Sequence, residues 1–167
     1  MLMTAPVRII PTTDSERIAE MARDIWWAYY PPIIGEEQVK YMLERFYALP
    51  SLQQQMEAGQ QFLRIEADDI AVGFFAYSRQ SAGEYFIHKW YISTAFQGRG
   101  IGRQVFGLWR EMCGDVEGVR LQVNRGNQQA ILFYERLGFE REREVKVDIG
   151  RGFFMDDYMM RYAMSMG

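Results

Sequence analysis

The chain has a single cysteine, Cys113, so no disulfide can join two of its own residues. It also lacks any apolar run approaching the roughly 20 residues that a membrane-spanning helix needs, and its first residues show no signal-peptide pattern. From these absences we expect a cytoplasmic protein without a membrane partner. Basic residues are outnumbered, 19 Lys and Arg against 22 Asp and Glu, and the net charge of −3 argues against nucleic-acid binding.

The residues that are present have the composition of an ordinary globular domain, 49% hydrophobic and 25% charged. A length of 167 residues suits one domain with a single core, spanning residues 1–167. Hydrophobic periodicity and turn residues predict a mixed α/β fold in which helices and strands are interspersed. The predicted strands are residues 7–10, closed by Pro11, and residues 62–66, 71–77, 85–92, 119–123, 142–149 and 153–164.

Glycines cluster at residues 97–102, which read Gln-Gly-Arg-Gly-Ile-Gly. The cluster follows the strand-like run at 85–92 and precedes a helix-like run at 103–112. A strand that opens through glycines into a helix exposes backbone N–H groups at the positive end of the helix dipole, which suits a phosphate or pyrophosphate. Glycine permits the backbone to approach the phosphate, and we expect positive φ at some of these positions.

Two other glycine-rich phosphate loops do not fit this cluster. A Walker loop ends in Gly-Lys-Ser/Thr, whereas Gly102 is followed by Arg103 and Gln104. The dinucleotide fingerprint needs a third glycine three residues after its second, and the positions so reached are Arg103 and Val105. What fits at every specified position is Gln/Arg-x-x-Gly-x-Gly/Ala.

A second motif follows the predicted strand at 119–123. Residues 124–139 read Asn-Arg-Gly-Asn-Gln-Gln-Ala-Ile-Leu-Phe-Tyr-Glu-Arg-Leu-Gly-Phe. Without a gap, this segment resembles the pattern Asn-x-x-Asn-x-x-Ala-x-x-Phe-Tyr-x-x-x-Gly-Phe. In this order and at this separation, the two motifs resemble the signatures of the GNAT N-acetyltransferase superfamily.

The resemblance implies a fold, a reaction and a co-substrate. The fold is a mixed, mostly antiparallel sheet flanked by helices, with one parallel strand pair splayed where acetyl-coenzyme A binds. The reaction moves the acetyl group to a primary amine by direct attack in a ternary complex, without a metal. The family's commonest oligomeric state is a homodimer, which we expect here.

The resemblance also implies which residues contact the co-substrate. The end of the strand at 85–92 would pair its backbone with the amide arm, and the glycine loop would hold the pyrophosphate. Asn127 stands where the family places an asparagine beside the arm, and the same residue also suits an N-cap. The expected cofactor-binding residues are Trp90, Tyr91, Ile92, Gln97, Gly98, Arg99, Gly100, Ile101, Gly102, Arg103, Asn127 and Tyr134.

Acetyl transfer to an amine requires a group that removes a proton from the ammonium and a group that protonates the departing thiolate. Tyr134 resembles the family tyrosine that lies near the sulfur, and it is our candidate acid; the alternative is a core aromatic. His88, the chain's only histidine, is a candidate base because imidazole titrates near neutrality when unperturbed; the alternative is a structural histidine. Glu84, on the same strand face by alternation, is a second candidate base that would act through water.

The acceptor site is expected between the first helices and the last two strands. Trp27 and Tyr30 lie in an aromatic run that ends at two prolines, and their rings suit a cationic amine. Trp26 and Tyr29 are expected in the core instead. Asp156 and Asp157 suit a second ammonium group, with a solvated strand end as the alternative. Residues 152–160 also resemble a C-terminal pattern in bacterial members of the superfamily, some of which acetylate polyamines, and some arylalkylamine-acetylating members have a histidine at the step of His88. The resemblance therefore implies a small-molecule acceptor such as a polyamine or an arylalkylamine.

Three other functions remain open from the sequence. The chain is alternatively a non-catalytic acyl-coenzyme A sensor, which the presence of Tyr134 and a candidate base disfavours. It is alternatively a protein or peptide N-terminal acetyltransferase, which would need an open groove. A transferase acting on charged tRNA would need a basic surface, and the acidic balance of the chain disfavours it.

Overall fold

The computed structural model describes residues 6–164. The chain divides into two compact units. The first unit comprises residues 1–78 and 89–114, and the second comprises residues 79–88 and 115–167. The expected single domain over residues 1–167 stays a prediction.

The strands form one mixed sheet with the order β1-β2-β3-β4-β5-β7-β6. The pairs β1–β2, β2–β3, β5–β7 and β6–β7 are antiparallel, and β4–β5 is parallel, which confirms the expected mostly antiparallel sheet with one parallel pair. The register of β4 with β5 joins Glu84–Ile87 to Gly118–Leu121. The strands are β1 Val7–Thr12, β2 Gln61–Ala67, β3 Ile70–Ser81, β4 Glu84–Ile92, β5 Gly118–Asn124, β6 Glu140–Gly150 and β7 Phe153–Ala163.

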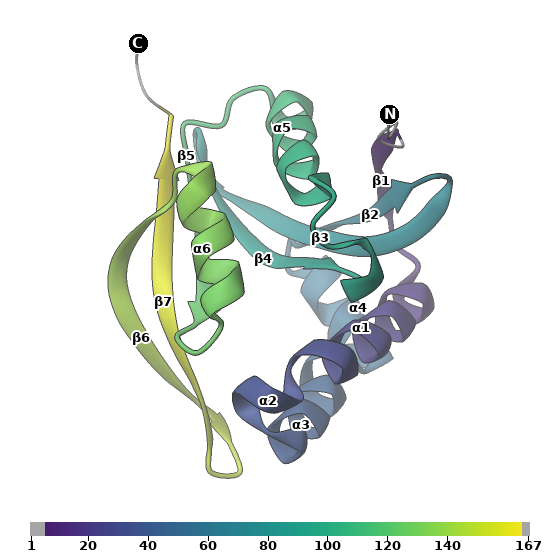
Figure 1. The fold of residues 1–167 in the computed structure, drawn as a ribbon, viewed down its shortest axis with the longest axis vertical. Coiled ribbons are helices and arrows are strands. Elements are labelled where there is room, and N and C mark those ends of the chain that lie inside the picture. The colour runs from purple at the N-terminus through teal and green to yellow at the C-terminus, as the bar shows by residue number, and fades with distance from the viewer. Residues whose placement is uncertain (1–5, 165–167) are drawn as a thin grey trace. The chain divides into compact units, whose positions relative to one another are not determined.

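In the first unit, helices cover both faces of the strands. Figure 1 shows α1 to α4 on one side of β1 to β3 and α5 on the other. Neighbouring residues of β3 pack against opposite layers: Phe74 packs on Tyr47, and Phe75 packs on Trp109 of α5. This alternation is the period-two pattern of a strand that is buried on both faces. The helices are α1 Ser15–Tyr29, α2 Pro31–Ile34, α3 Glu36–Phe46, α4 Leu49–Glu57 and α5 Ile101–Cys113.

In the second unit, α6 (Gln128–Leu137) connects the parallel strand β5 to the hairpin of β6 and β7. Ile131 of α6 is buried, and Phe139, which follows the helix, packs on Tyr162 of β7. The helix ends at Gly138, which adopts a left-handed conformation with φ of 114°. These contacts hold α6 against β7.

The start of the chain departs from the predicted elements at two prolines. Pro11 does not close the first strand but lies within β1, paired with Leu63 of β2. Proline is tolerated there because β1 is at the edge of the sheet. Pro31, where the aromatic run ends, begins the short helix α2, because proline suits the first turn of a helix.

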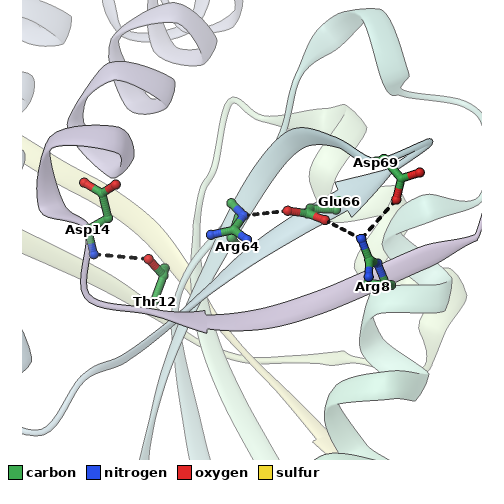
Figure 2. A network of polar contacts seen from close by, with 6 residues as sticks. All are labelled: Arg8, Thr12, Asp14, Arg64, Glu66 and Asp69. Carbon is green, nitrogen blue, oxygen red and sulfur yellow. Dashed lines mark hydrogen bonds and ion pairs between the residues drawn. The ribbon is translucent and has the colours of Figure 1, made fainter.

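A polar network joins β1 to the β2–β3 hairpin in the first unit (Figure 2). Arg8 bonds Glu66 at 2.9 Å and Asp69 at 3.0 Å, and Arg64 donates to Glu66 at 2.8 Å. The hydrogen bond and charge of Arg64, with help from Arg8, hold the pKa of Glu66 below its usual value. Asp68 and Asp69 form the turn between β2 and β3 and adopt positive φ angles of 55° and 61°.

Candidate functional site

The glycine loop leads from β4 into α5 through a short 3₁₀ turn, Thr94–Phe96, which the sequence did not predict. Gly98 and Gly100 adopt φ angles of 78° and 76°, which confirms the expectation that this loop needs positive φ. Both glycines are exposed, and an added Cβ on either would meet no heavy atom within 4 Å. The protein itself therefore leaves space above this backbone.

The start of α5 offers N–H groups that the helix does not use. The N-cap residue Gly100 makes no side-chain capping hydrogen bond, and no acidic residue lies in the first turn. The first helical bond runs from the N–H of Gln104 to the carbonyl of Gly100, at 3.2 Å. The N–H groups of Ile101, Gly102 and Arg103 precede that bond. Together with the helix dipole, they are suited to an anion.

The side chains of the loop divide into one that braces it and two that add positive charge. Gln97 donates from Nε2 to the carbonyl of Ile92 at 3.1 Å, which ties the loop to the end of β4. The Arg99 guanidinium lies over the ring of Phe96, 4.9 Å from its centroid. Arg103 is exposed on the first turn of α5. Sequence reasoning assigned Gln97 to the cofactor and missed its bracing hydrogen bond.

The end of β4 is held on both of its faces. Trp90 stacks with Phe106 of α5 at 5.7 Å between ring centroids, whereas Tyr91 packs on Phe74 at 5.4 Å. An added Cβ on Gly73 of β3 would collide with the carbonyl oxygen of Tyr91. Glycine is therefore needed there for β4 to approach β3 closely. No motif in the sequence singles out Gly73.

The two predicted acceptor residues of the first unit lie in different surroundings. Tyr30 packs on Trp26 at 4.5 Å and lies 6.3 Å from Tyr91 between ring centroids. It therefore belongs to an aromatic cluster beside the end of β4. Trp27 is 44% exposed, so the structure does not bring it into this cluster. Trp26 is buried as expected, but Tyr29, expected in the core, is half-exposed.

In the second unit, Asn127 is buried and serves as the N-cap of α6. Its Oδ1 accepts a hydrogen bond from the N–H of Ala130 at 3.2 Å. The capping role that the sequence allowed is thus present. Tyr134, two turns further along α6, is half-buried, and its ring lies 5.7 Å from that of Phe139.

The two candidate bases also lie in the second unit. His88 is half-buried, and its ring centroid is 4.8 Å from that of Phe86. Glu84 accepts a hydrogen bond from Nη2 of Arg161 at 2.6 Å, and both side chains are 30% exposed. The side chain of Glu84 therefore has a structural partner in Arg161.

Asp156 and Asp157 lie within β7, not at a solvated strand end. They have opposite environments because they point to opposite faces. Asp156 is half-exposed, and its Oδ1 is 3.6 Å from Nη1 of Arg125. Asp157 is 4% exposed, and burial, with the charge of Asp156 adding to it, raises the pKa of Asp157 to about 6. A buried carboxylate of this kind favours a cationic neighbour.

Sequence reasoning missed one buried charged residue, Lys89 of β4. The side chain is 8% exposed, and burial lowers the pKa of its ammonium to about 7. The period-two pattern gave a usable signal, because Lys89 follows the buried residues Tyr85 and Ile87 at alternate positions of the strand.

Within residues 6–164, no group of three or more His, Cys, Asp and Glu side chains is arranged to hold a metal ion. None of the helices in this part of the chain has the length and apolar character to cross a membrane.

Known proteins share this fold across nearly the whole chain. PaiA N-acetyltransferase from Thermoplasma acidophilum, solved in complex with coenzyme A, is 21% identical, with a TM-score of 0.76 over 95% of this chain and 99% of its own. A GCN5-related N-acetyltransferase from Rhodopseudomonas palustris is 15% identical, with a TM-score of 0.77 over 98% of each chain. The ribosomal-protein-S18-alanine N-acetyltransferase of Escherichia coli is 14% identical, with a TM-score of 0.67 over 97% of this chain and 96% of its own.

Similarity in sequence is more local. An uncharacterized protein of Mycobacterium leprae is 36% identical over 58 residues, which are 35% of this chain and 16% of that protein. The chain thus covers only a small part of this relative. The match to a protein family is far broader, because residues 19–139 match the family described as "Acetyltransferase (GNAT) family". The chain therefore belongs to the GNAT acetyltransferase family.

Proposed function

We propose that this protein transfers the acetyl group of acetyl-coenzyme A to a primary amine of a small molecule. The observation that carries the proposal is the start of α5, where N–H groups follow two glycines of positive φ and no side chain caps the helix. A capped helix start satisfies its own donors, whereas this one presents them to an anion.

The pyrophosphate of the co-substrate would be held by the N–H groups of Ile101, Gly102 and Arg103, with Arg99 and Arg103 adding positive charge. Because the net charge of the chain is −3, this local supply of donors matters for an anionic ligand. The amide arm would pair with the backbone of Trp90, Tyr91 and Ile92. Asn127, besides capping α6, would contact the arm.

In the reaction, a C–N bond forms as the amine attacks the thioester carbonyl, and the C–S bond breaks. His88 takes a proton from the attacking amine, since imidazole changes charge near neutral pH when unperturbed. Tyr134 donates its phenolic proton to the departing sulfur. Neither residue forms a covalent bond to the acetyl group in this direct transfer.

The acceptor would be a cationic amine. The ring of Tyr30, in the aromatic cluster with Trp26 and Tyr91, supports binding of an ammonium through aromatic faces. Trp27, which is exposed on α1, would add a further aromatic ring at the edge of the acceptor site. In the second unit, Asp156 and Asp157 would attract a second ammonium group, which favours a polyamine over a monoamine.

The experiment that tests the proposal is thiol release from acetyl-coenzyme A in the presence of different amines. Polyamines, arylalkylamines, aminoglycosides, amino acids and short peptides are compared at equal concentration. We expect release that depends on one small-molecule class. Release with peptides alone would indicate protein acetylation instead. No release with any amine, while calorimetry still shows binding of the co-substrate, would indicate a sensor.

The role of His88 is tested in the same assay with His88→Gln. We expect kcat to fall about 10²-fold, as for loss of a general base, and the acidic limb of the pH–rate profile to disappear. The control is Glu84→Gln, which breaks the ion pair with Arg161 and should leave the shape of that limb unchanged. A limb that disappears in Glu84→Gln and persists in His88→Gln would reverse the assignment.

A further inference from the structure

Lys89 places its ammonium between two glutamine side chains in the first unit. Nζ donates to Oε1 of Gln55 in α4 at 2.5 Å and to Oε1 of Gln60, just before β2, at 2.8 Å. Two aromatic rings face the same nitrogen, with Phe62 at 5.1 Å and Tyr47 at 5.9 Å from their centroids. Each of these groups attracts positive charge.

No acidic side chain in the described part of the chain pairs with this ammonium. The groups that face it are amide oxygens from α4 and from residue 60, and rings from β2 and from the α3–α4 corner. The titratable members of this environment are Tyr47 and its hydrogen-bond partner Tyr91, and burial raises the pKa of Tyr47 so that it stays neutral. Lys89 is therefore the group of this cluster that changes charge near neutral pH.

Gln55 connects Lys89 to the corner between α3 and α4. Its Nε2 donates to the carbonyl of Phe46 at 2.8 Å and to Oγ of Ser51 at 3.2 Å. These two bonds fix the orientation of the amide, so that its oxygen points to Lys89. The lysine thereby joins β4 to the residue that ends α3.

Tyr47 extends the connection into the aromatic cluster. Its ring centroid is 5.7 Å from that of Trp26 and 6.0 Å from that of Phe74, and its side chain is hydrogen-bonded to Tyr91. Tyr30 stacks on Trp26 at 4.5 Å. An unbroken series of contacts within the first unit thus leads from Lys89 to the residue proposed to bind the amine.

We propose that Lys89 is a positioning residue for the acceptor, whose protonated side chain holds the α3–α4 corner and its aromatic cluster on β4. This inference rests on the proposed function, since Tyr30 is assigned to the acceptor there. A neutral lysine keeps two N–H donors for the two glutamines but loses its attraction to the rings. Affinity for the acceptor is therefore higher below about pH 7 than above it.

The first test is a direct titration of the wild-type protein by NMR, with ¹³C-labelled lysine. The chain has three lysines, and the exposed Lys40 and Lys146 supply reference signals. We expect the signal that is absent from Lys89→Met to titrate near pH 7, and the ring signals of Tyr47 to shift with the same midpoint. A lysine that stays protonated to about pH 9, or Tyr47 signals that ignore it, would overturn the proposal.

The second test compares kinetics of the wild type, Lys89→Met and Lys89→Arg from pH 6 to 9. The ionisations of the amine and of His88 are common to all three, so they cancel in ratios. At pH 6 we expect KM for the amine to be about three- to tenfold higher in Lys89→Met, the effect of losing about 1 kcal/mol of cation–ring attraction. At pH 8.5 the ratio should be smaller, because the neutral lysine has lost the same attraction to the rings and keeps only its two N–H donors, with kcat within about twofold throughout.

Lys89→Arg keeps its charge throughout this pH range. The pH dependence of its KM should therefore match that of Lys89→Met, in which residue 89 also does not titrate. A KM ratio that is independent of pH, or a change confined to kcat, would show a role in packing alone. Absence of turnover with every amine would instead overturn the proposed function. In that case the NMR titration of Lys89 and Tyr47 still decides whether the lysine controls the corner.

Discussion

Two helices of this protein follow parallel strands, and they begin in opposite ways. At the β4–α5 junction, Gly100 takes the N-cap position and no side chain satisfies the first N–H groups. At the β5–α6 junction, Asn127 caps the helix through its side chain and is 3% exposed. One helix start is thus capped by a side chain of the protein, and the other is not.

Further internal hydrogen bonds hold the closed junction. Oδ1 of Asn124 accepts from the N–H of Gly126 at 2.8 Å, and the N–H of Arg125 donates to the carbonyl of Asp156 at 3.0 Å. At the open junction, the side chain of Gln97 donates to the carbonyl of Ile92 in the preceding strand. The first turn of α5 has no side-chain capping hydrogen bond.

The largest effect is expected for Gly100→Val, at the open junction. A side chain at this position would block the approach of a pyrophosphate to the backbone, so we expect acetyl-coenzyme A to bind at least about 100-fold more weakly in calorimetry. Gly114→Val is the matched control, because Gly114 at the other end of α5 has a φ of 78° beside the 76° of Gly100. Equal affinity in the two variants would refute the loop assignment.

Tyr134→Phe tests whether Tyr134, two turns into α6, acts as the general acid. Loss of a general acid should lower kcat about 10- to 100-fold, while the Kd for acetyl-coenzyme A stays within about twofold. Tyr162→Phe removes a hydroxyl from the other ring that packs on Phe139 and should leave kcat unchanged. If both variants turn over like the wild type, Tyr134 is a packing residue.

Asp157 lies opposite Asn124 in the β5–β7 register, beside the closed junction. Because its pKa is raised from 3.8 to about 6, the folded state holds more protons than the unfolded state between these values, and stability falls as pH rises through them. Relative to Asp157→Asn, the wild type should lose about 2 kcal/mol of unfolding free energy from pH 4 to pH 7. Urea unfolding measures this, with Asp156→Asn as the exposed control.

The smallest expected effect sharpens the role of the cap. Asn127→Ala should destabilise the protein by about 1 kcal/mol, and Asn127→Ser, which keeps a capping oxygen, should restore most of it. If Asn127 also contacts the co-substrate, the serine variant will recover stability in urea unfolding without recovering affinity for acetyl-coenzyme A. Recovery of both would reduce Asn127 to a cap.

The glycine loop was the most predictable part of the site, because its conformation depends on the types of its own residues. Positive φ at Gly98 and Gly100 follows from local sterics, and so does the turn at Asp68 and Asp69. The capping role of Asn127 was equally predictable, since its partner is only three positions away in the sequence. Local rules therefore predict conformations and contacts whose partners are close in sequence.

Interactions between distant residues were not predictable in this way. The ion pair of Glu84 and Arg161 joins residues 77 positions apart, and Lys89 meets Gln55 across 34. Pro11 was read as a strand end because the sequence does not show that β1 lies at the edge of the sheet. Which faces meet is decided by packing, so the partners of Glu84 and Lys89 required the structure.

The division into two units gives the protein a built-in optical asymmetry. Its four tryptophans, residues 26, 27, 90 and 109, all belong to the first unit, whereas tyrosines occur in both. Tryptophan fluorescence therefore follows the first unit alone, and far-ultraviolet circular dichroism follows the whole chain. Superimposable denaturation curves from the two methods would mean one cooperative domain, and separated curves would mean that the units melt independently.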